Sequence, residues 1–179
     1  MIQKYSAKDY LEQSAQQLLA VKGIDRVTVK DICENCGVST RTFYKYYRDK
    51  YDVINTCFND ELENFYRQHQ GPISLHPFIF FTTDIVNEHL DFYGNVFRYT
   101  GQNNIRRYLV IPLSEHYLRI IRDYCHAEIT QEIRDAVTFY LQGQLAFVEE
   151  ALTRAQIPDS STSVAFFENA IPALLQPFL

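Results

Sequence analysis

The sequence predicts an all-α protein, with a three-helix head at its N-terminus, a helical bundle behind it, and about nine helices in total. Apolar residues recur at helical spacing along most of the 179 residues, and no segment shows the alternation of a strand. Two short helical patterns within residues 28–50 meet at Gly37, which is typical of a helix-turn-helix. Every lysine precedes Tyr51, so the chain divides into a basic segment and an acidic one. We therefore expect two domains, residues 1–50 and 51–179.

The first motif helix carries clear start and stop signals. Thr28 is placed to cap it, and Asp31 stands three residues later, where a capping box takes an acid. Val27 and Ile32 are spaced as a hydrophobic staple. Gly37 follows the last apolar position and readily adopts the left-handed conformation that ends a helix. The pattern predicts a helix from the residue after Thr28 to the residue before Gly37.

The second motif helix is short and polar. Ser39 is its expected cap, and Val38 and Phe43 again have staple spacing. Phe43 and Tyr47 are four residues apart and are expected to pack inward. Asp49 is then expected to cap a longer helix that reaches about residue 69. A first helix, capped by Ser6 and ended near Gly23, should cover the backs of both motif helices.

The outward residues of the motif have the chemistry of a DNA-binding surface. Arg and Lys neutralise phosphates and reach guanine edges, and hydroxyl groups donate to phosphate oxygens. Arg41 is the best candidate for reading a base, whereas Thr28, Tyr44 and Lys50 are expected at phosphates. A solvated helix face is the alternative interpretation of such residues. The expected DNA contacts are Thr28, Ser39, Thr40, Arg41, Thr42, Tyr44, Lys45, Tyr46 and Lys50.

The charge distribution supports a DNA-binding head. Residues 1–50 hold six Lys and three Arg against six acids, a net charge of +3. Residues 51–179 hold eight Arg and no Lys against sixteen acids, a net charge of −8, which gives the overall −5. A basic head on an acidic body is the pattern expected of a DNA reader with a separate regulatory domain.

The run GVSTRTFYKYYRDKYDVI, residues 37–54, resembles the signature of TetR/AcrR-type transcriptional regulators. The matching positions are Gly37, Val38, Ser39, Thr42, Phe43, Tyr44, Tyr47, Asp49 and Lys50. Arg41 and Tyr46 depart from the family pattern, in which Gly and His are common. The run FYKYYRDKYDVIN is also similar to a Gram-positive subgroup that includes regulators of dihydroxyacetone kinase operons. The resemblance implies a DNA-binding head, an effector pocket in the bundle and a homodimer.

Four helical stretches are expected beyond residue 71. They cover residues 75–93, 105–126 with Pro112 as a kink, 128–154 and 159–171, and residues 94–104 form a short helix or a loop. Helical bundles enclose ligands between helices lined by aromatic side chains. A pocket would involve Phe81, His89, Tyr93, Leu109 and His116, although plain core packing remains the alternative for each. His89 and His116 fall on faces expected to be buried.

By the family resemblance, the last two helices should pair with their copies in a four-helix dimer interface. The residues expected there are Val137, Tyr140, Leu141, Gln144, Val148, Phe166, Phe167 and Ile171. Their apolar surfaces could equally serve the chain's own core. A two-fold pair on palindromic DNA would supply the affinity that one small head lacks.

Several other kinds of site and chemistry are disfavoured. Cys33 and Cys36 resemble half of a zinc site, but a second pair is missing, so we interpret them as small apolar side chains, with a redox switch as a minor alternative. The five histidines form no tight ligand motif, and no catalytic motif appears. We expect no metal, cofactor or enzymatic activity. No apolar run is long enough for a membrane span and no signal peptide is apparent, so a cytoplasmic location with reduced thiols is expected.

The sequence therefore predicts a transcriptional regulator that binds a palindromic operator in double-stranded DNA as a homodimer. A repressor released by a small-molecule effector is the favoured interpretation. One alternative is an activator or a regulator controlled by a protein partner instead of a small molecule. A helical enzyme or carrier with an incidental helix-turn-helix is the other.

Overall fold

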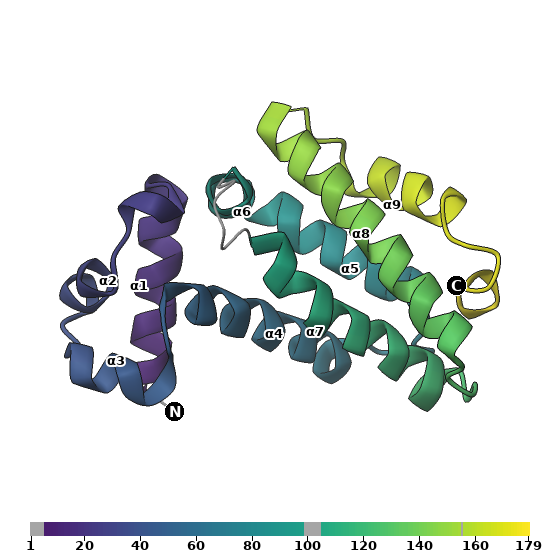
Figure 1. Cartoon of the computed structure of the whole chain (residues 1–179), viewed down its shortest axis with the longest axis horizontal. Coiled ribbons are helices and arrows are strands. Elements are labelled where there is room, and N and C mark those ends of the chain that lie inside the picture. The colour runs from purple at the N-terminus through teal and green to yellow at the C-terminus, as the bar shows by residue number, and fades with distance from the viewer. Residues whose placement is uncertain (1–5, 99–104, 155) are drawn as a thin grey trace.

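The structure, a computed structural model, describes residues 6–98, 105–154 and 156–179 (Figure 1). These residues form nine α-helices and no strand, which confirms the all-α class. The head contains α1 Ala7–Val21, α2 Val29–Cys36 and α3 Thr40–Tyr46. The body contains α4 Lys50–Gln68, α5 Leu75–Glu88, α6 Leu90–Phe97, α7 Ile105–Arg119, α8 Gln131–Arg154 and α9 Ser160–Asn169. Short turns follow α1, α7 and α9, at Ile24–Arg26, Ile120–Tyr124 and Gln176–Phe178.

The head helices begin and end at the signals that the sequence carries. Ser6 and Thr28 each form a complete capping box, with Asp9 and Asp31 respectively. Such reciprocal pairs satisfy amide groups that a helix N-terminus leaves without partners. Gly37 has φ = 69°, the left-handed conformation in which a side chain would be strained. These local interactions fix the bend between α2 and α3.

A small apolar core holds the three head helices together. Leu11 and Leu19 of α1, Ile32 of α2 and Phe43 of α3 are all 0% exposed. Ser14 of α1 donates to the Ile32 carbonyl at 2.7 Å. The Tyr47 hydroxyl, expected to lie inward, donates to Glu12 of α1 at 2.6 Å. The head therefore presents α3 on a rigid base.

Helices α7 and α8 pack together in the body, as do α5 and α9, and α4 leads from the head along α7 (Figure 1). The prediction of one helix over residues 75–93 is wrong, because the chain breaks at His89 into α5 and α6. Gly94, assigned to a loop or short helix, lies inside α6, and residues 99–104 fall outside the described part. No helix in the described ranges has the length and hydropathy that crossing a bilayer requires.

Helix α6 ties the body to the head. Asn95 of α6 donates its side-chain amide to the carbonyls of Leu19 and Ala20, at 3.0 and 2.8 Å. These are carbonyls of the last turn of α1, which have no partner within the helix. Lys8 of α1 also pairs with Asp60 of α4 at 2.8 Å. A movement of α6 or α4 would therefore be transmitted to the head.

Candidate nucleic-acid interface and internal cavity

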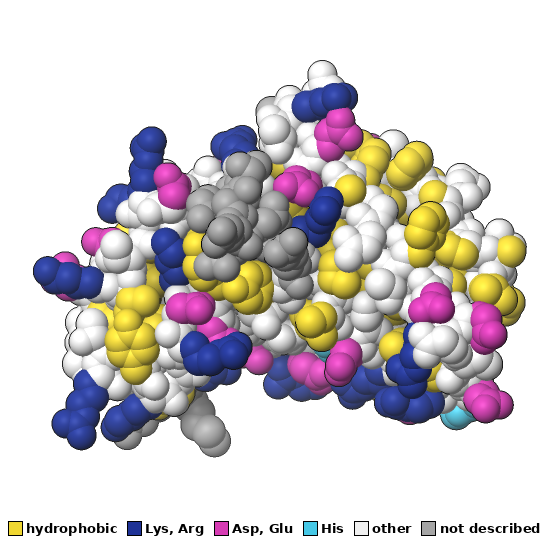
Figure 2. Space-filling model, in the orientation of Figure 1, with side chains coloured by type: hydrophobic (Ala, Val, Ile, Leu, Met, Phe, Trp, Pro, Cys, Tyr) yellow, Lys and Arg dark blue, Asp and Glu magenta, His cyan; other side chains and the backbone are white. Residues whose placement is uncertain are grey.

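Helix α3 exposes a row of polar and aromatic side chains on the outer surface of the head. Tyr44 is 61% exposed and Tyr46 is 48% exposed. Thr40, Arg41 and Lys45 are also exposed. Lys and Arg side chains project at this end of the head in the space-filling view (Figure 2). Phe43, on the opposite side of the same helix, packs into the core of the head, so the polar side chains point outward.

Arg41 and Lys45 are available to bind anions. Within the described residues, neither side chain forms an ion pair. They lie four residues apart, so both project from one face of α3. A guanidinium can bind a guanine edge or a phosphate with two hydrogen bonds, whereas an ammonium acts as a point charge. This face has the chemistry needed to contact a duplex.

Three of the predicted DNA contacts serve the head's own helix caps. The Thr28 hydroxyl donates to the Asp31 carboxylate at 2.6 Å, so its proton is not free for a phosphate. Ser39 Oγ accepts from the Thr42 amide at 3.1 Å and lies 2.9 Å from Thr42 Oγ1. A phosphate contact through the Thr28 hydroxyl remains a prediction, and it would compete with the capping hydrogen bond to Asp31. Thr28 and Ser39 are exposed as well, but the exposed residues of the predicted set that take no part in these caps are Thr40, Arg41, Tyr44, Lys45 and Tyr46.

The Lys50 side chain also forms contacts within the head. Its ammonium group donates to the carbonyls of Ile24 and Val27, the latter at 2.7 Å, inside the head. Partial burial lowers the pKa of Lys50 from its ordinary value. The side chain therefore links α4 to the turn that precedes α2, and the predicted phosphate contact would require these hydrogen bonds to break.

Replacing Lys50 with Met should destabilise the head. The aliphatic stem would remain, but two carbonyls would lose a charged donor, which typically costs about 1–3 kcal/mol. Thermal and urea unfolding of the variant would measure the loss. Lys30→Met is the matched control, because Lys30 is exposed on the same head and its one ion pair with a described residue is that with Glu34, at 3.6 Å. Unchanged stability with uniformly weaker DNA binding would restore the phosphate role.

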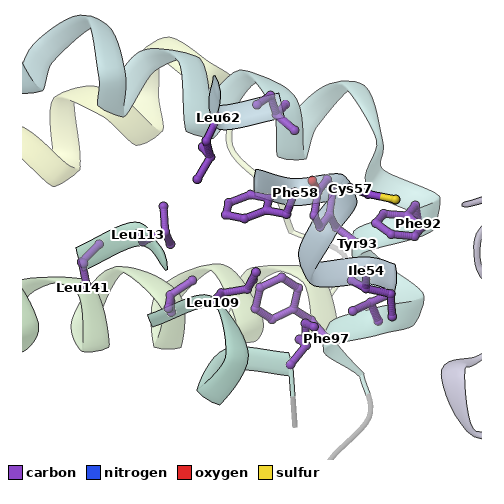
Figure 3. Packing of buried hydrophobic residues seen from close by; sticks show 14 of the residues in the cluster. Ile54, Cys57, Phe58, Leu62, Phe92, Tyr93, Phe97, Leu109, Leu113 and Leu141 are labelled. Atoms are coloured by element: carbon purple, nitrogen blue, oxygen red, sulfur yellow. The ribbon is translucent and has the colours of Figure 1, made fainter. Parts of the chain in front are cut away.

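The body encloses an apolar cavity of about 70 Å³ between α4 and the surrounding helices. Figure 3 shows Phe58 of α4 on one side of this region and Leu109, Leu113 and Leu141 on the other. Tyr93 and Phe97 of α6 complete the nearby wall, and α5, α8 and α9 supply the rest. None of the described residues that line it is charged. The cavity therefore suits a neutral molecule.

A chain of hydrogen bonds joins Tyr117, Gln144 and Phe167, which line the cavity, through Tyr140, which is not among the described lining residues. The Tyr117 hydroxyl donates to Gln144 Oε1 at 3.0 Å, and Gln144 Nε2 donates to the Tyr140 hydroxyl at 3.2 Å. Tyr140 in turn donates to the Phe167 carbonyl at 2.8 Å. Burial raises the pKa of Tyr117, so its hydroxyl stays protonated. Gln144 can thus offer a hydrogen bond to a ligand that has few polar groups.

Of the five predicted pocket residues, two line the cavity and three lie outside it. Tyr93 and Leu109 line the cavity. Phe81 instead lies in a surface groove between α4 and α5. His89, expected to be buried, is exposed at the break between α5 and α6. His116 is buried as expected, but its Nδ1 lies 3.1 Å from the Tyr66 hydroxyl outside the cavity, and burial lowers its pKa.

Most residues predicted for the dimer surface point into the chain's own core. Val137, Tyr140, Leu141, Phe167 and Ile171 are at most 5% exposed. Leu141, Gln144, Val148 and Phe167 line the cavity. Of this set, Phe166 is the large exposed side chain, at 50%. The helical spacing of α8 did not reveal which of its apolar faces is turned inward.

Other apolar side chains are exposed on the last helices. Phe139 of α8 is 78% exposed and Leu174, after α9, is 54% exposed. Phe166 stacks on Phe147, with ring centroids 4.7 Å apart, and thereby continues the surface from α9 to α8. Figure 2 shows hydrophobic side chains gathered over these two helices. In the sequence, Phe139 is an aromatic residue on the polar side of the α8 pattern, and this position could have indicated that its side chain is exposed.

The cysteine pair lies beneath the helix-turn-helix bend. Cys33 is 3% exposed, and burial raises the pKa of its thiol. The Cys36 thiol donates to the Ile32 carbonyl at 3.2 Å. All four cysteines are free thiols. Both members of the pair thus occupy the place of small core side chains.

Comparisons with known proteins agree with this geometry. Residues 13–57 match the sequence profile described as "Bacterial regulatory proteins, tetR family". The dihydroxyacetone kinase operon activator DhaS has a similar structure, with a TM-score of 0.66, 13% identity, and coverage of 96% of this chain and 97% of that one. A TetR transcriptional regulator from Rhodococcus sp. RHA1 has a TM-score of 0.65 and 15% sequence identity, and the match covers 95% of this chain and 94% of that one. RolR in complex with resorcinol has a TM-score of 0.55 and 19% sequence identity, and the match covers 95% of this chain and 89% of that one. Curated protein sequences gave no match.

The head, its exposed α3 and the all-helical body define a DNA-binding transcriptional regulator of the helix-turn-helix class. By the sequence of residues 13–57 and by its fold, the chain is similar to regulators of the TetR family.

Proposed function

We propose that the protein is a ligand-responsive repressor that binds a palindromic operator as a homodimer. The observation that carries the DNA-binding part is the outward row on α3, in which Arg41 and Lys45 are exposed and lack ion pairs in the described chain. A short recognition helix covers only a few base pairs. Two copies, about one helical turn of DNA apart, would double the contact surface.

The cavity supports a small, neutral and mostly apolar effector. The wall residues that the structure describes carry no charge, and Gln144 and Tyr117 supply hydrogen-bonding groups. Resorcinol, the ligand in the RolR complex, is a neutral aromatic diol and has this chemistry. The effector of this protein would thus be an aromatic or aliphatic compound with one or two hydroxyl or carbonyl groups.

The size of the cavity suggests how binding would act on DNA. Ligand pockets typically measure about 300–1,000 Å³, so a cavity of about 70 Å³ must widen to hold an effector. Tyr93 and Phe97 of α6 and Phe58 of α4 are among the walls that would move. Because Asn95 ties α6 to α1, this movement would tilt the head and change the separation of the two recognition helices. Such coupling typically amounts to about 1–3 kcal/mol.

Exposed apolar side chains on α8 and α9 support the homodimer. Phe139, Phe166 and Leu174 are each at least half exposed. Contiguous apolar surface on a protein usually marks an interaction site. A two-fold axis through this surface would leave α3 of each protomer free, since the head lies at the opposite end of the molecule from α9 (Figure 1).

Arg41→Ala should remove sequence preference from DNA binding. A bidentate contact from arginine to guanine is typically worth about 1–3 kcal/mol of discrimination, so affinity for the cognate duplex should fall much more than affinity for a scrambled one. Fluorescence anisotropy with both duplexes, the cognate one taken from the footprint upstream of the protein's own gene, measures the difference. Arg154→Ala, at the far end of α8, is the matched charge control. Equal losses on the two duplexes would contradict base reading by Arg41.

Activation is the second candidate function. DhaS, which has a similar fold, is described as an activator, so the sign of regulation is open to test. Control by a protein partner would replace the effector in this case. A thermal-shift screen that finds no ligand, together with a partner that co-purifies with the protein, would favour it. Release of the operator by a neutral aromatic compound would favour the repressor.

A further inference from the structure

A second opening lies where the head meets the body, outside the cavity described above. It is a groove of about 580 Å³ bounded by α1, α4 and the break between α5 and α6. Gln16, Gln17 and Ala20 of α1 form the side that belongs to the head. A molecule in this groove would touch the head and the body at once.

The charges that line the groove have one sign. Glu61, Glu88 and Asp91 are among its walls, and none of the lining residues is Lys or Arg. Glu61 accepts a 3.5 Å hydrogen bond from Asn64, and in the described residues none of the three carboxylates forms an ion pair. Opposite charge is therefore missing from the groove, and a cation would be attracted to it.

Buried polar and aromatic groups provide an independent sign of a ligand. Tyr93 is 5% exposed and lines the groove, and its hydroxyl has no hydrogen-bond partner among the described residues. The hydroxyl oxygen is not among the fully buried polar atoms, so this otherwise buried side chain keeps its polar end accessible to a molecule in the groove. Figure 3 shows Tyr93 and Phe92 close to Cys57, which belongs to the same wall. Aromatic rings beside carboxylates form a favourable environment for an organic cation.

We propose that this groove binds an organic ammonium ion with an apolar body. The ammonium would donate hydrogen bonds to Glu61, Glu88 or Asp91 and to the Tyr93 hydroxyl. Its apolar part would lie against Phe92 and Leu90, which also line the groove. The site is separate from the neutral cavity, although Tyr93 and Asn87 belong to both walls.

Benzylammonium and benzyl alcohol provide the test, because they are similar in size and differ in charge at neutral pH. In NMR titrations of the full-length protein, benzylammonium should bind saturably, and several-fold more tightly than benzyl alcohol. Glu61→Gln/Glu88→Gln should weaken benzylammonium binding by about four- to twenty-fivefold, since each solvent-accessible charge contact contributes about two- to fivefold. Tyr93→Phe should weaken it by about threefold or more while the protein stays folded.

Glu128→Gln/Glu150→Gln is the matched control, because it changes the net charge equally at exposed positions outside the groove. This variant should bind benzylammonium as the wild type does. Equal binding of both compounds, no saturable binding of benzylammonium, or an equal loss in the control variant would overturn the proposal. Since the titration contains no DNA, benzylammonium binding by a protein that fails to bind DNA would refute the proposed function and leave this site standing.

Discussion

Phe139→Glu should convert the protein to a monomer and abolish high-affinity operator binding. Phe139 of α8 is 78% exposed and is one of the exposed apolar side chains that α8 and α9 carry. A two-fold axis would bring the two introduced carboxylates close together and would remove two aromatic anchors. Truncation of a central aromatic residue alone typically costs about 2–4 kcal/mol of binding energy. Analytical ultracentrifugation and anisotropy with the palindromic duplex measure the two effects.

Ile111→Glu is the matched control for this variant. Ile111 of α7 is 67% exposed, so the same charge enters another exposed apolar position. This control should remain a dimer and bind DNA normally. A Phe139→Glu protein that stays dimeric and binds the operator with wild-type affinity would show that the protomers pair elsewhere.

Phe43→Ala should lower the free energy of unfolding by about 3–5 kcal/mol, the usual cost of truncating a buried phenylalanine. Phe43 is 0% exposed, and its ring centroid lies 5.4 Å from that of Tyr47. Loss of the ring would leave a void between α3 and α1. Urea unfolding followed by circular dichroism would measure the change, and DNA binding should fail because the head no longer holds α3.

Tyr44→Ala separates stability from DNA contact. Tyr44 is the next residue of the same helix, but it is 61% exposed, so its removal should change stability by only about 0.5 kcal/mol. DNA binding should weaken because the hydroxyl is then missing from the outer face. Similar stability losses for the two variants would contradict the orientation of α3.

Local interactions made the head predictable from the sequence. The capping boxes at Ser6 and Thr28 and the left-handed Gly37 depend on residues at most three positions apart. The inward position of Phe43 and Tyr47 follows from their four-residue spacing. The structure agrees with each of these expectations. The orientation of the Lys50 ammonium was not predictable, because its acceptors Ile24 and Val27 lie more than twenty residues away.

The body was less predictable because its helices are apolar on more than one face. In α8, Val137, Leu141 and Phe139 are similar in hydropathy, but neighbouring helices bury the first two and leave Phe139 exposed. The break at His89 has no proline or glycine signal at that position. Tertiary packing decides both features, so the division between cavity and exposed surface required the structure.

The central claim is that two copies of α3 read one palindromic site. Sedimentation of the protein with a duplex taken from the footprint upstream of its own gene, at low salt, tests this claim most directly. The account predicts two protomers on each duplex and two protected half-sites about one helical turn apart. Absence of a complex, or a complex with one protomer on an asymmetric site, would contradict it.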